Sequence, residues 1–467
     1  MTRTIVESLF ERKYLLLVFI FLTALFTIRF MVVGYGVGGD GIGYYAYLPS
    51  LIIDHDLDFE NQYLSSPWIN SSNKFMDKSA AVSLMGDRLS KLTPEGYVSN
   101  PYPIGSAVLW LPFFILSLIL TSFLNLLGFN FPMNGYSVIS QYVTLIGSIV
   151  YAVAGLLLAN RLIGNFGIKQ KAIVLSMGFI LVGTFAIQYL AVEPSMSHAN
   201  DFFIVTLFFY FFYNYFILTD NKTTHANWIL FGLICGLMAI VRQQNVVFLI
   251  LPAINYLSTL ASEKEPLQIV VKRESINLLL FGVSFSVSLL PQLLSWKVLY
   301  GSFITIPQGR DYLHFSSPQI LTLLFSFNHG LLTSSPILIF SLIGLILLLK
   351  NYKKDKSSAH NRLLVFLSLA FLSQVYINSV IVDVWGGDSF GSRRFAGLIL
   401  VFILGLAYFI DYIDDKKFKN AVYVILTALV ALNLIYFMEY NLLIIPRFGE
   451  VTYLDLISNL FKLLRIS

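Results

Sequence analysis

The sequence predicts an all-helical protein that crosses a membrane many times. Hydrophobic residues make up 57% of its 467 residues and charged residues only 12%. Soluble domains carry about 25% charged residues, so a chain this apolar lacks the polar surface that water requires. Long apolar runs recur along the chain, and a bilayer core needs about 20 such residues per helix. Helices are favoured as the spanning form because lipid offers no partners for unpaired backbone groups.

Apolar runs predict about 11 transmembrane helices in a single domain that covers residues 1–467. The run at 105–127 is ambiguous. The first span reads as uncleaved, because it is too long for a signal peptide and lacks a small-residue cleavage site. The expected spans are residues 14–33, 137–160, 172–191, 202–219, 227–241, 246–261, 276–296, 331–349, 363–382, 395–411 and 421–440.

Basic residues predict the orientation, because short cytoplasmic loops are rich in Lys and Arg. Basic clusters occur at the N-terminus and after the second, sixth, eighth and tenth runs. These basic clusters all fall on one side of the membrane only if residues 105–127 do not cross it. We therefore expect a re-entrant or membrane-surface helix at residues 105–127. The N-terminus is then cytoplasmic and the C-terminus lies outside. The clusters begin at Arg3, Lys169, Lys264, Lys350 and Lys416.

This orientation places one large feature outside, the first loop at residues 34–136. Juxtamembrane helices are expected in it. Residues 441–467 are expected to form an outer tail with an amphipathic helix at its end. The single cysteine, Cys235, excludes an intrachain disulfide and a CxxC metal site. The basic residues are scattered between apolar runs, which does not favour nucleic acid as a partner.

Asp40 follows the first span in the glycine-rich stretch "VVGYGVGGDGIGYY". One interpretation is a helix N-cap, whose carboxylate accepts the free N–H groups of the first turn. The other is a catalytic base at the hydrocarbon boundary, where desolvation would raise its basicity. Both can hold. The acids of "DHDLDFE" (residues 54–60) could bind a divalent cation, although a solvated loop is the more ordinary interpretation.

Three further outer segments carry charged side chains. Glu193 and His198 are expected to line a polar mouth between two spans, since no third zinc ligand is evident. Arg242 interrupts an apolar stretch and suits a phosphate, or else pairs with an acid such as Asp40 or Glu193. The third outer segment consists of two parts, residues 310–329 and 385–397. Its candidate site residues are Arg310, His329, Asp388, Arg393 and Arg394.

Glycine-rich backbone beside Arg393 and Arg394 is typical of an anion-binding turn, although adjacent arginines near a span end can also be interface anchors. Together these segments bring arginines and carboxylates to one face of an apolar bundle. A lipid-phosphate-linked substrate needs such a face, with its tail in the bilayer and its phosphate at the interface. The arrangement would support glycosyl transfer by direct displacement.

The chain resembles the GT-C class of membrane glycosyltransferases, in the branch of protein O-mannosyltransferases and aminoarabinose transferases. Asp40 and Tyr44 match that branch's Asp and Tyr after the first span, and "NPYPIGSAVLWLPFF" matches its juxtamembrane helix. "GLMAIVRQQN" places Arg242 at the cation position. "LYGSFITIPQG", "FSFNHGLLTSSPI" and "WGGDSFGSRRF" look like segments of bacterial members. The chain departs from the pattern at Gly41, where several members of that branch carry Glu, and at Gln243–Gln244, where the cation is otherwise followed by Gly-Pro.

The resemblance implies a GT-C-like fold and an inverting glycosyltransferase in a bacterial inner membrane, with a periplasmic active site. The donor would be a polyprenyl-phosphate-linked sugar, the acceptor a lipid or glycan, and no metal would be obligatory. Asp40 would be the base and Arg242, Arg393 and Arg394 would hold the donor phosphate. Alternatives are a transporter or flippase for a lipid-linked saccharide, and a polymerase or ligase with a diphosphate-linked donor. Residues expected to line the substrate are Tyr44, Tyr45, Glu193, His198, Arg310, His329 and Asp388.

Overall fold

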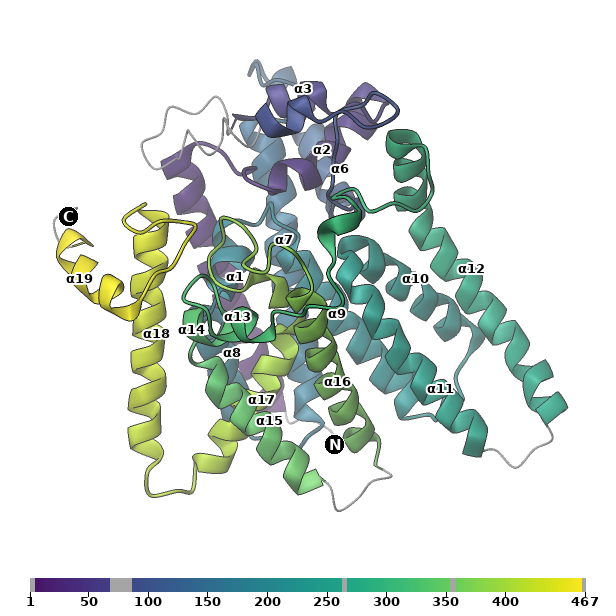
Figure 1. Cartoon of the computed structure of the whole chain (residues 1–467), viewed down its shortest axis with the longest axis vertical. Helices are drawn as coiled ribbons and strands as arrows, with labels where there is room; N and C mark the ends of the chain where they lie inside the picture. The colour runs from purple at the N-terminus through teal and green to yellow at the C-terminus, as the bar shows by residue number, and fades with distance from the viewer. Residues whose placement is uncertain (1–4, 68–85, 263–266, 353–357, 464–467) are drawn as a thin grey trace.

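A computed structural model describes residues 5–67, 86–262, 267–352 and 358–463. Their regular secondary structure is helical, with isolated bridges only at Leu92–Val98 and Leu313–Ile381. Figure 1 shows the helices packed as a bundle, with α12 and α18 on opposite flanks and α2 and α3 near one end. The chain is therefore a polytopic helical membrane protein, as its composition predicts.

Eight helices in the described part are long and apolar enough to cross a membrane. All but one coincide with expected spans, and the exception is Gly105–Leu126. The total of 11 spans, the membrane side of each end and the non-crossing placement of residues 105–127 stay predictions. The eight are Lys13–Val33, Gly105–Leu126, Val138–Gly164, Gln243–Ala261, Glu274–Tyr300, Ala359–Ser379, Arg393–Ile413 and Lys419–Asn441, and shorter apolar helices are Gln170–Gly183, His225–Val241 and Leu338–Asn351.

The elements follow one another in chain order, with π-helical or 3-10 turns (η) between several α-helices. The helices are α1 (Ile5–Val33), α2 (Gly41–Pro49), α3 (Glu60–Leu64), α6 (Gly105–Leu126), α7 (Val138–Gly164), α8 (Gln170–Gly183), α9 (His198–Phe212), α10 (His225–Val241), α11 (Ile250–Ser262), α12 (Leu267–Tyr300), α13 (Ile320–Phe325), α14 (Leu331–Ser334), α15 (Leu338–Tyr352), α16 (Ala359–Ser379), α17 (Ile399–Ile413), α18 (Lys419–Asn441) and α19 (Tyr453–Leu463). The turns are η1 (Ser50–Asp54), η2 (Gln188–Val192), η3 (Tyr213–Ile217), η4 (Gln243–Leu249), η5 (Arg310–Tyr312) and η6 (Arg393–Leu398).

The expected span 172–191 is not one continuous α-helix. α8 ends at Gly183 because Thr184 is extended, with φ −141° and ψ −176°. Asn433 of α18 donates hydrogen bonds to the backbone oxygens of Val182 and Thr184, at 2.7 and 3.2 Å. These bonds satisfy carbonyl groups that a helix end would otherwise leave unpaired. The break allows the polar segment after η2 to turn toward the cavity described below.

The expected span 331–349 is also interrupted. Proline lacks a backbone N–H, and its ring clashes with the preceding turn. Pro336 lies between α14 and α15, which accounts for the break.

The centre of the bundle is α17, which is buried over most of its length. It packs closely on α15 through glycines on both helices. A Cβ atom on Gly405 would lie 2.0 Å from the backbone oxygen of Ser341, so no larger residue fits without a shift. Small residues of this kind permit close backbone approach between membrane helices. α17 begins directly after η6, so the same packing fixes the position of the two arginines that start η6.

Candidate functional site

One large cavity, of about 1110 Å³, lies between α1, the start of α2, the turn after η2, residues 242–247 and the loop 383–394. Small-molecule sites commonly measure about 300–1,000 Å³, so this cavity has room for a large ligand. Its apolar wall includes Leu25, Ile28, Val32 and Val33 of α1 with Val246 and Val247 of η4. Its charged side chains are Arg29, Asp40, Glu193, Arg242, Asp383, Asp388, Arg393, Arg394 and Arg447.

Local backbone geometry places Asp40 at this cavity. Gly39 has a positive φ of 56°, which glycine adopts without steric cost, and α2 begins immediately after Asp40. A Cβ atom on Gly41 would lie 2.2 Å from the side-chain oxygen of Ser195. The start of α2 therefore packs against the turn after η2 in a way that only glycine allows. A glutamate side chain has no room at this position in the present arrangement.

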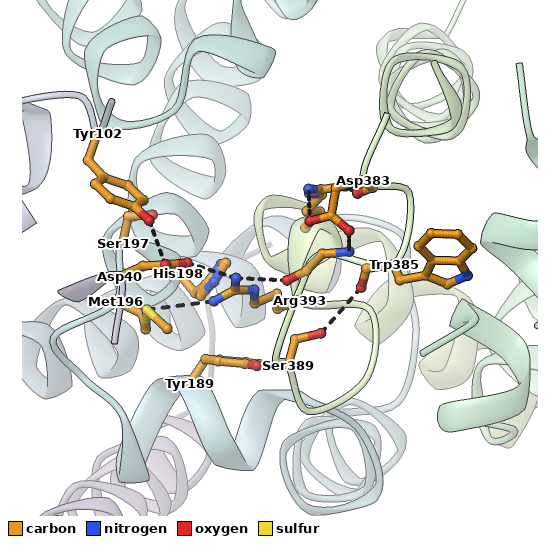
Figure 2. Close-up of polar contacts among 12 residues, drawn as sticks. Asp40, Tyr102, Tyr189, Met196, Ser197, His198, Asp383, Trp385, Ser389 and Arg393 are labelled. Carbon is orange, nitrogen blue, oxygen red and sulfur yellow. Dashed lines mark hydrogen bonds and ion pairs between the residues drawn. The ribbon is translucent and has the colours of Figure 1, made fainter. Parts of the chain in front are cut away.

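The N-cap interpretation of Asp40 is wrong. Its backbone precedes α2, but the side chain makes no capping hydrogen bond. Instead the Tyr102 hydroxyl donates to Asp40 Oδ1 at 2.5 Å, and Arg393 Nη2 donates to Oδ2 at 2.7 Å. Arg88 Nη2 lies 3.6 Å from Oδ1 and donates to the Tyr102 hydroxyl at 2.7 Å. Figure 2 shows Asp40 between Tyr102 and Arg393.

The expected rise in the basicity of Asp40 is also wrong for this arrangement. Burial raises the pKa of the carboxyl group, but Arg393 and Arg88, with the hydrogen bonds from Tyr102 and Arg393, outweigh burial, so the pKa lies below its ordinary value of 3.8. Opposite charges within a few ångströms favour the ionised form. Asp40 is therefore a carboxylate at neutral pH and is held by two cations.

Arg393 connects Asp40 to the glycine-rich loop. Its Nη2 also donates to the backbone oxygen of Gly386 at 2.8 Å, and its Nη1 donates to the Met196 sulfur at 3.7 Å. Gly386 has a φ of 82°, which lets this loop turn back toward the cavity. The Arg393 side chain is only 13% exposed, so it is not an interface anchor.

Arg394 and Arg242 share a frame of polar side chains. Arg394 contacts Asp383 through both the backbone and the side-chain oxygens, the latter at 3.4 Å. Arg242 follows α10 and lies near His198 Nδ1 at 3.1 Å and Gln244 Oε1 at 3.3 Å. Gln244 in turn donates to the backbone oxygen of Arg394 at 2.9 Å. One glutamine thus links the two arginines.

The carboxylate that pairs with Arg242 is not one of those expected from sequence. Asp40 pairs with Arg393 instead, and no ion pair joins Arg242 to Glu193 in the described part. Arg242 Nε lies 3.6 Å from Oδ2 of the fully buried Asp201. Asn245 donates to the other oxygen of Asp201 at 2.7 Å. Arg242 is therefore held to α9 through Nε, while Nη1 and Nη2 contact His198 and Gln244, which also line the cavity.

Most residues predicted for the site line this one cavity. Tyr45 does not, because it is fully buried in the core and donates to the backbone oxygen of Gly135 at 2.8 Å. His329 is also buried behind the wall, where its Nδ1 lies 3.1 Å from the Ser389 hydroxyl. The Arg310 side chain lies outside the described residues. The predicted residues that line the cavity are Asp40, Tyr44, Glu193, His198, Arg242, Asp388, Arg393 and Arg394.

Sequence reasoning missed four residues that the fold brings to the site. Arg29 stands inside the first apolar run, and that position alone is a signal of function. Tyr102 lies in the "NPYPIG" stretch that carries part of the resemblance. Arg88 belongs to the expected first outer loop and Arg447 to the expected tail, where nothing in the local pattern distinguishes them from ordinary surface arginines.

The acids at residues 54–60 have local structural partners. Asp56 Oδ1 accepts from the Ser50 hydroxyl at 2.8 Å and from the Asp58 backbone at 3.2 Å. Asp54 accepts from the side chains of Asn61 and Gln62. Across the residues that the structure describes, no group of three or more His, Cys, Asp and Glu side chains is close enough to hold a metal ion.

Comparisons with protein-family models, with curated proteins and with solved structures find no match to this chain.

Proposed function

We propose that the protein is an inverting glycosyltransferase that moves a sugar from a polyprenyl-phosphate donor to an extracytoplasmic lipid or glycan acceptor. The reaction takes place on the periplasmic side of a bacterial inner membrane and has no obligatory metal. Asp40 is the catalytic base. Arg242, Arg393 and Arg394 hold the donor phosphate.

The observation that carries this proposal is the composition of the large cavity. It combines an ionised carboxylate, several guanidinium groups and an apolar wall. Guanidinium groups bind phosphate through two nitrogen atoms at once, and the apolar wall suits an isoprenoid chain. Ile28 and Val32 of that wall are 60% and 48% exposed, so lipid can reach it. A purely soluble substrate would not need such a wall.

The proposed step is a direct displacement at the anomeric carbon of the donor sugar. An acceptor hydroxyl oxygen forms the new glycosidic bond while the bond from the anomeric carbon to the phosphate oxygen breaks. The electron pair leaves with the lipid phosphate, whose added charge is stabilised by the arginines. Asp40 takes the proton of the attacking hydroxyl. One displacement inverts the configuration.

The ion pair between Asp40 and Arg393 couples donor binding to basicity. Without donor, Arg393 lowers the pKa of Asp40 and makes it a weak base. A donor phosphate attracts the same guanidinium and shares its charge. The carboxylate then loses part of the attraction that holds its pKa down, and its basicity rises. Asp40 thus becomes a competent base only when donor is present.

The test is glycosyl transfer by the purified protein in detergent, with polyprenyl-phosphate sugars as donors and extracted envelope lipids and glycans as acceptors. Asp40→Asn keeps the shape and an acceptor for Tyr102 but cannot take a proton, so we expect transfer to be lost. The melting temperature of the variant shows whether it is folded. Full transfer by Asp40→Asn would refute the assignment of the base.

The same assay separates the proposal from the alternatives. Detergent solution has no compartments, so a transporter would form no new glycosidic bond there. Donors with one or two phosphates distinguish a phosphate-linked from a diphosphate-linked leaving group. We expect product with the monophosphate donor.

A further inference from the structure

Five arginines line the cavity, and only three of them have a carboxylate partner. Arg29 and Arg447 have none within 4.0 Å among the described residues. The three pairs and their N···O distances are Arg393–Asp40 at 2.7 Å, Arg394–Asp383 at 3.4 Å and Arg242–Asp201 at 3.6 Å.

Arg29 and Arg447 line the same cavity together with Tyr35 and Tyr440, although 418 positions separate the two arginines in the sequence (447 minus 29). Arg29 Nη1 donates to the backbone oxygen of Tyr35 at 2.8 Å, and its guanidinium lies 5.1 Å from the centre of that ring. Arg447 lies 5.0 Å from the centre of the Tyr440 ring. The charges of both arginines act on the Tyr35 hydroxyl. The two therefore form one cationic corner of the cavity.

The partners in this corner leave part of the Arg447 guanidinium group unsatisfied. Arg447 Nε is buried and has no hydrogen-bond partner among the described residues. Contacts with aromatic faces offset part of the cost of burying a cation, but they do not satisfy its N–H groups. Glu193 and Asp388 line the same cavity and act on Arg447 electrostatically, but both lie beyond ion-pair distance of it. Arginine inside apolar surroundings without a paired acid is usually functional.

We propose that Arg29 and Arg447 form a second anion site, which binds a phosphate group of the acceptor. This proposal rests on the proposed function, because it assigns the donor phosphate to Arg242, Arg393 and Arg394 and leaves the second corner to the other substrate. The acceptor is then a phosphate-bearing lipid or glycan. Its hydroxyl group reaches the Asp40 region while its phosphate is held at the Arg29–Arg447 corner.

The experiment counts phosphate amphiphiles bound to the full chain. The probe is n-dodecyl phosphate, added to the purified protein in dodecyl maltoside and followed by native mass spectrometry. Inorganic phosphate is titrated in parallel, since binding of that ion alone would indicate a soluble rather than a lipid source. The wild type is expected to bind two molecules of n-dodecyl phosphate.

The variants assign each molecule to a corner. Arg447→Gln and Arg29→Gln should each weaken one of the two binding events roughly tenfold to a hundredfold, as expected for a lost hydrogen bond to a charged group. Arg242→Gln should weaken the other. Arg447→Lys keeps the charge and should bind better than Arg447→Gln. Arg161→Gln, at the exposed far end of α7, is the matched control and should bind as the wild type does.

Each outcome of the binding experiment either supports or overturns the second anion site. One bound molecule that depends on Arg242 but not on Arg29 or Arg447 overturns the second site and leaves the proposed function standing. No binding by the wild type overturns both. A melting temperature for every variant identifies any that is misfolded, and Arg447→Lys then supplies the comparison. Two events that respond separately to the two sets of variants support the second site.

Discussion

Arg393→Gln is the substitution that most directly tests the physics of the site. It removes the cation that contacts Asp40 at 2.7 Å and leaves Arg88 at 3.6 Å. Coulomb attraction falls as the inverse of distance, so Arg88 provides about three quarters of the attraction that Arg393 provides at the same dielectric. Loss of a close opposite charge moves a carboxyl pKa by about 1–3 units. We therefore expect the pKa of Asp40 to rise by that amount.

The assay is infrared difference spectroscopy of the purified protein as a function of pH. Protonation of Asp40 gives a carboxylic C=O band, which is identified by its loss in Asp40→Asn. This readout needs no substrate and no activity. Arg393→Lys keeps a cation and should shift the midpoint less than Arg393→Gln. Arg88→Gln should shift it by a smaller amount than Arg393→Gln, in line with the longer contact.

The ion pair between Asp40 and Arg393 also determines the direction in which stability changes with pH. The lowered pKa of Asp40 stabilises the fold above the ordinary value of 3.8, and this stabilisation is lost as pH falls through the folded pKa. Removing one partner of a buried pair costs about 3–5 kcal/mol, and Asp40 is 25% exposed, so a smaller cost is expected here. An unchanged Asp40 midpoint in Arg393→Gln would refute the coupling between donor phosphate and basicity.

Two further substitutions test the surroundings of the site. Gly41→Ala places a Cβ atom 2.2 Å from the Ser195 hydroxyl oxygen, and such overpacking should cost about 1–3 kcal/mol in stability. The melting temperature of this variant should therefore fall. The control Gly282→Ala has no atom within 4 Å of its Cβ and should leave the melting temperature unchanged or raise it. Burial, assisted by the charge of Arg393, lowers the pKa of His329 to about 4. Unfolding exposes this histidine to protonation, so stability should decrease by about 3 kcal/mol in total as pH falls from its ordinary pKa of 6.5 toward 4. His329→Gln should flatten that part of the melting-temperature profile, and an unchanged slope would show that His329 does not titrate as described.

The sequence predicted the membrane class and most helix positions because these depend on local apolar content. It did not predict where two of the runs break. The end of α8 depends on the extended conformation of Thr184 and on Asn433 from a helix far along the chain. The Pro336 break was readable in principle, since proline removes a backbone donor wherever it occurs.

Some residues of the candidate site were likewise predictable from the sequence, and others were not. Asp40, Arg242 and Arg393 stood out because charges beside or within apolar runs are unusual. Arg88 and Arg447 did not, because arginine outside the apolar runs is ordinary until the fold buries it. The burial of Tyr45 was also invisible, since successive residues of a short helix face different neighbours.

By itself, then, the sequence determined that this chain folds as helices within a bilayer and which polar side chains stand at the ends of those helices. Only the tertiary structure decided which charges meet. Asp40 and Arg393 are separated by 353 positions, and their contact at 2.7 Å depends on glycine-permitted packing at Gly41 and on the close approach of α15 and α17. The pKa of a carboxylate is set by charges within a few ångströms, so its chemistry follows from packing rather than from its place in the chain.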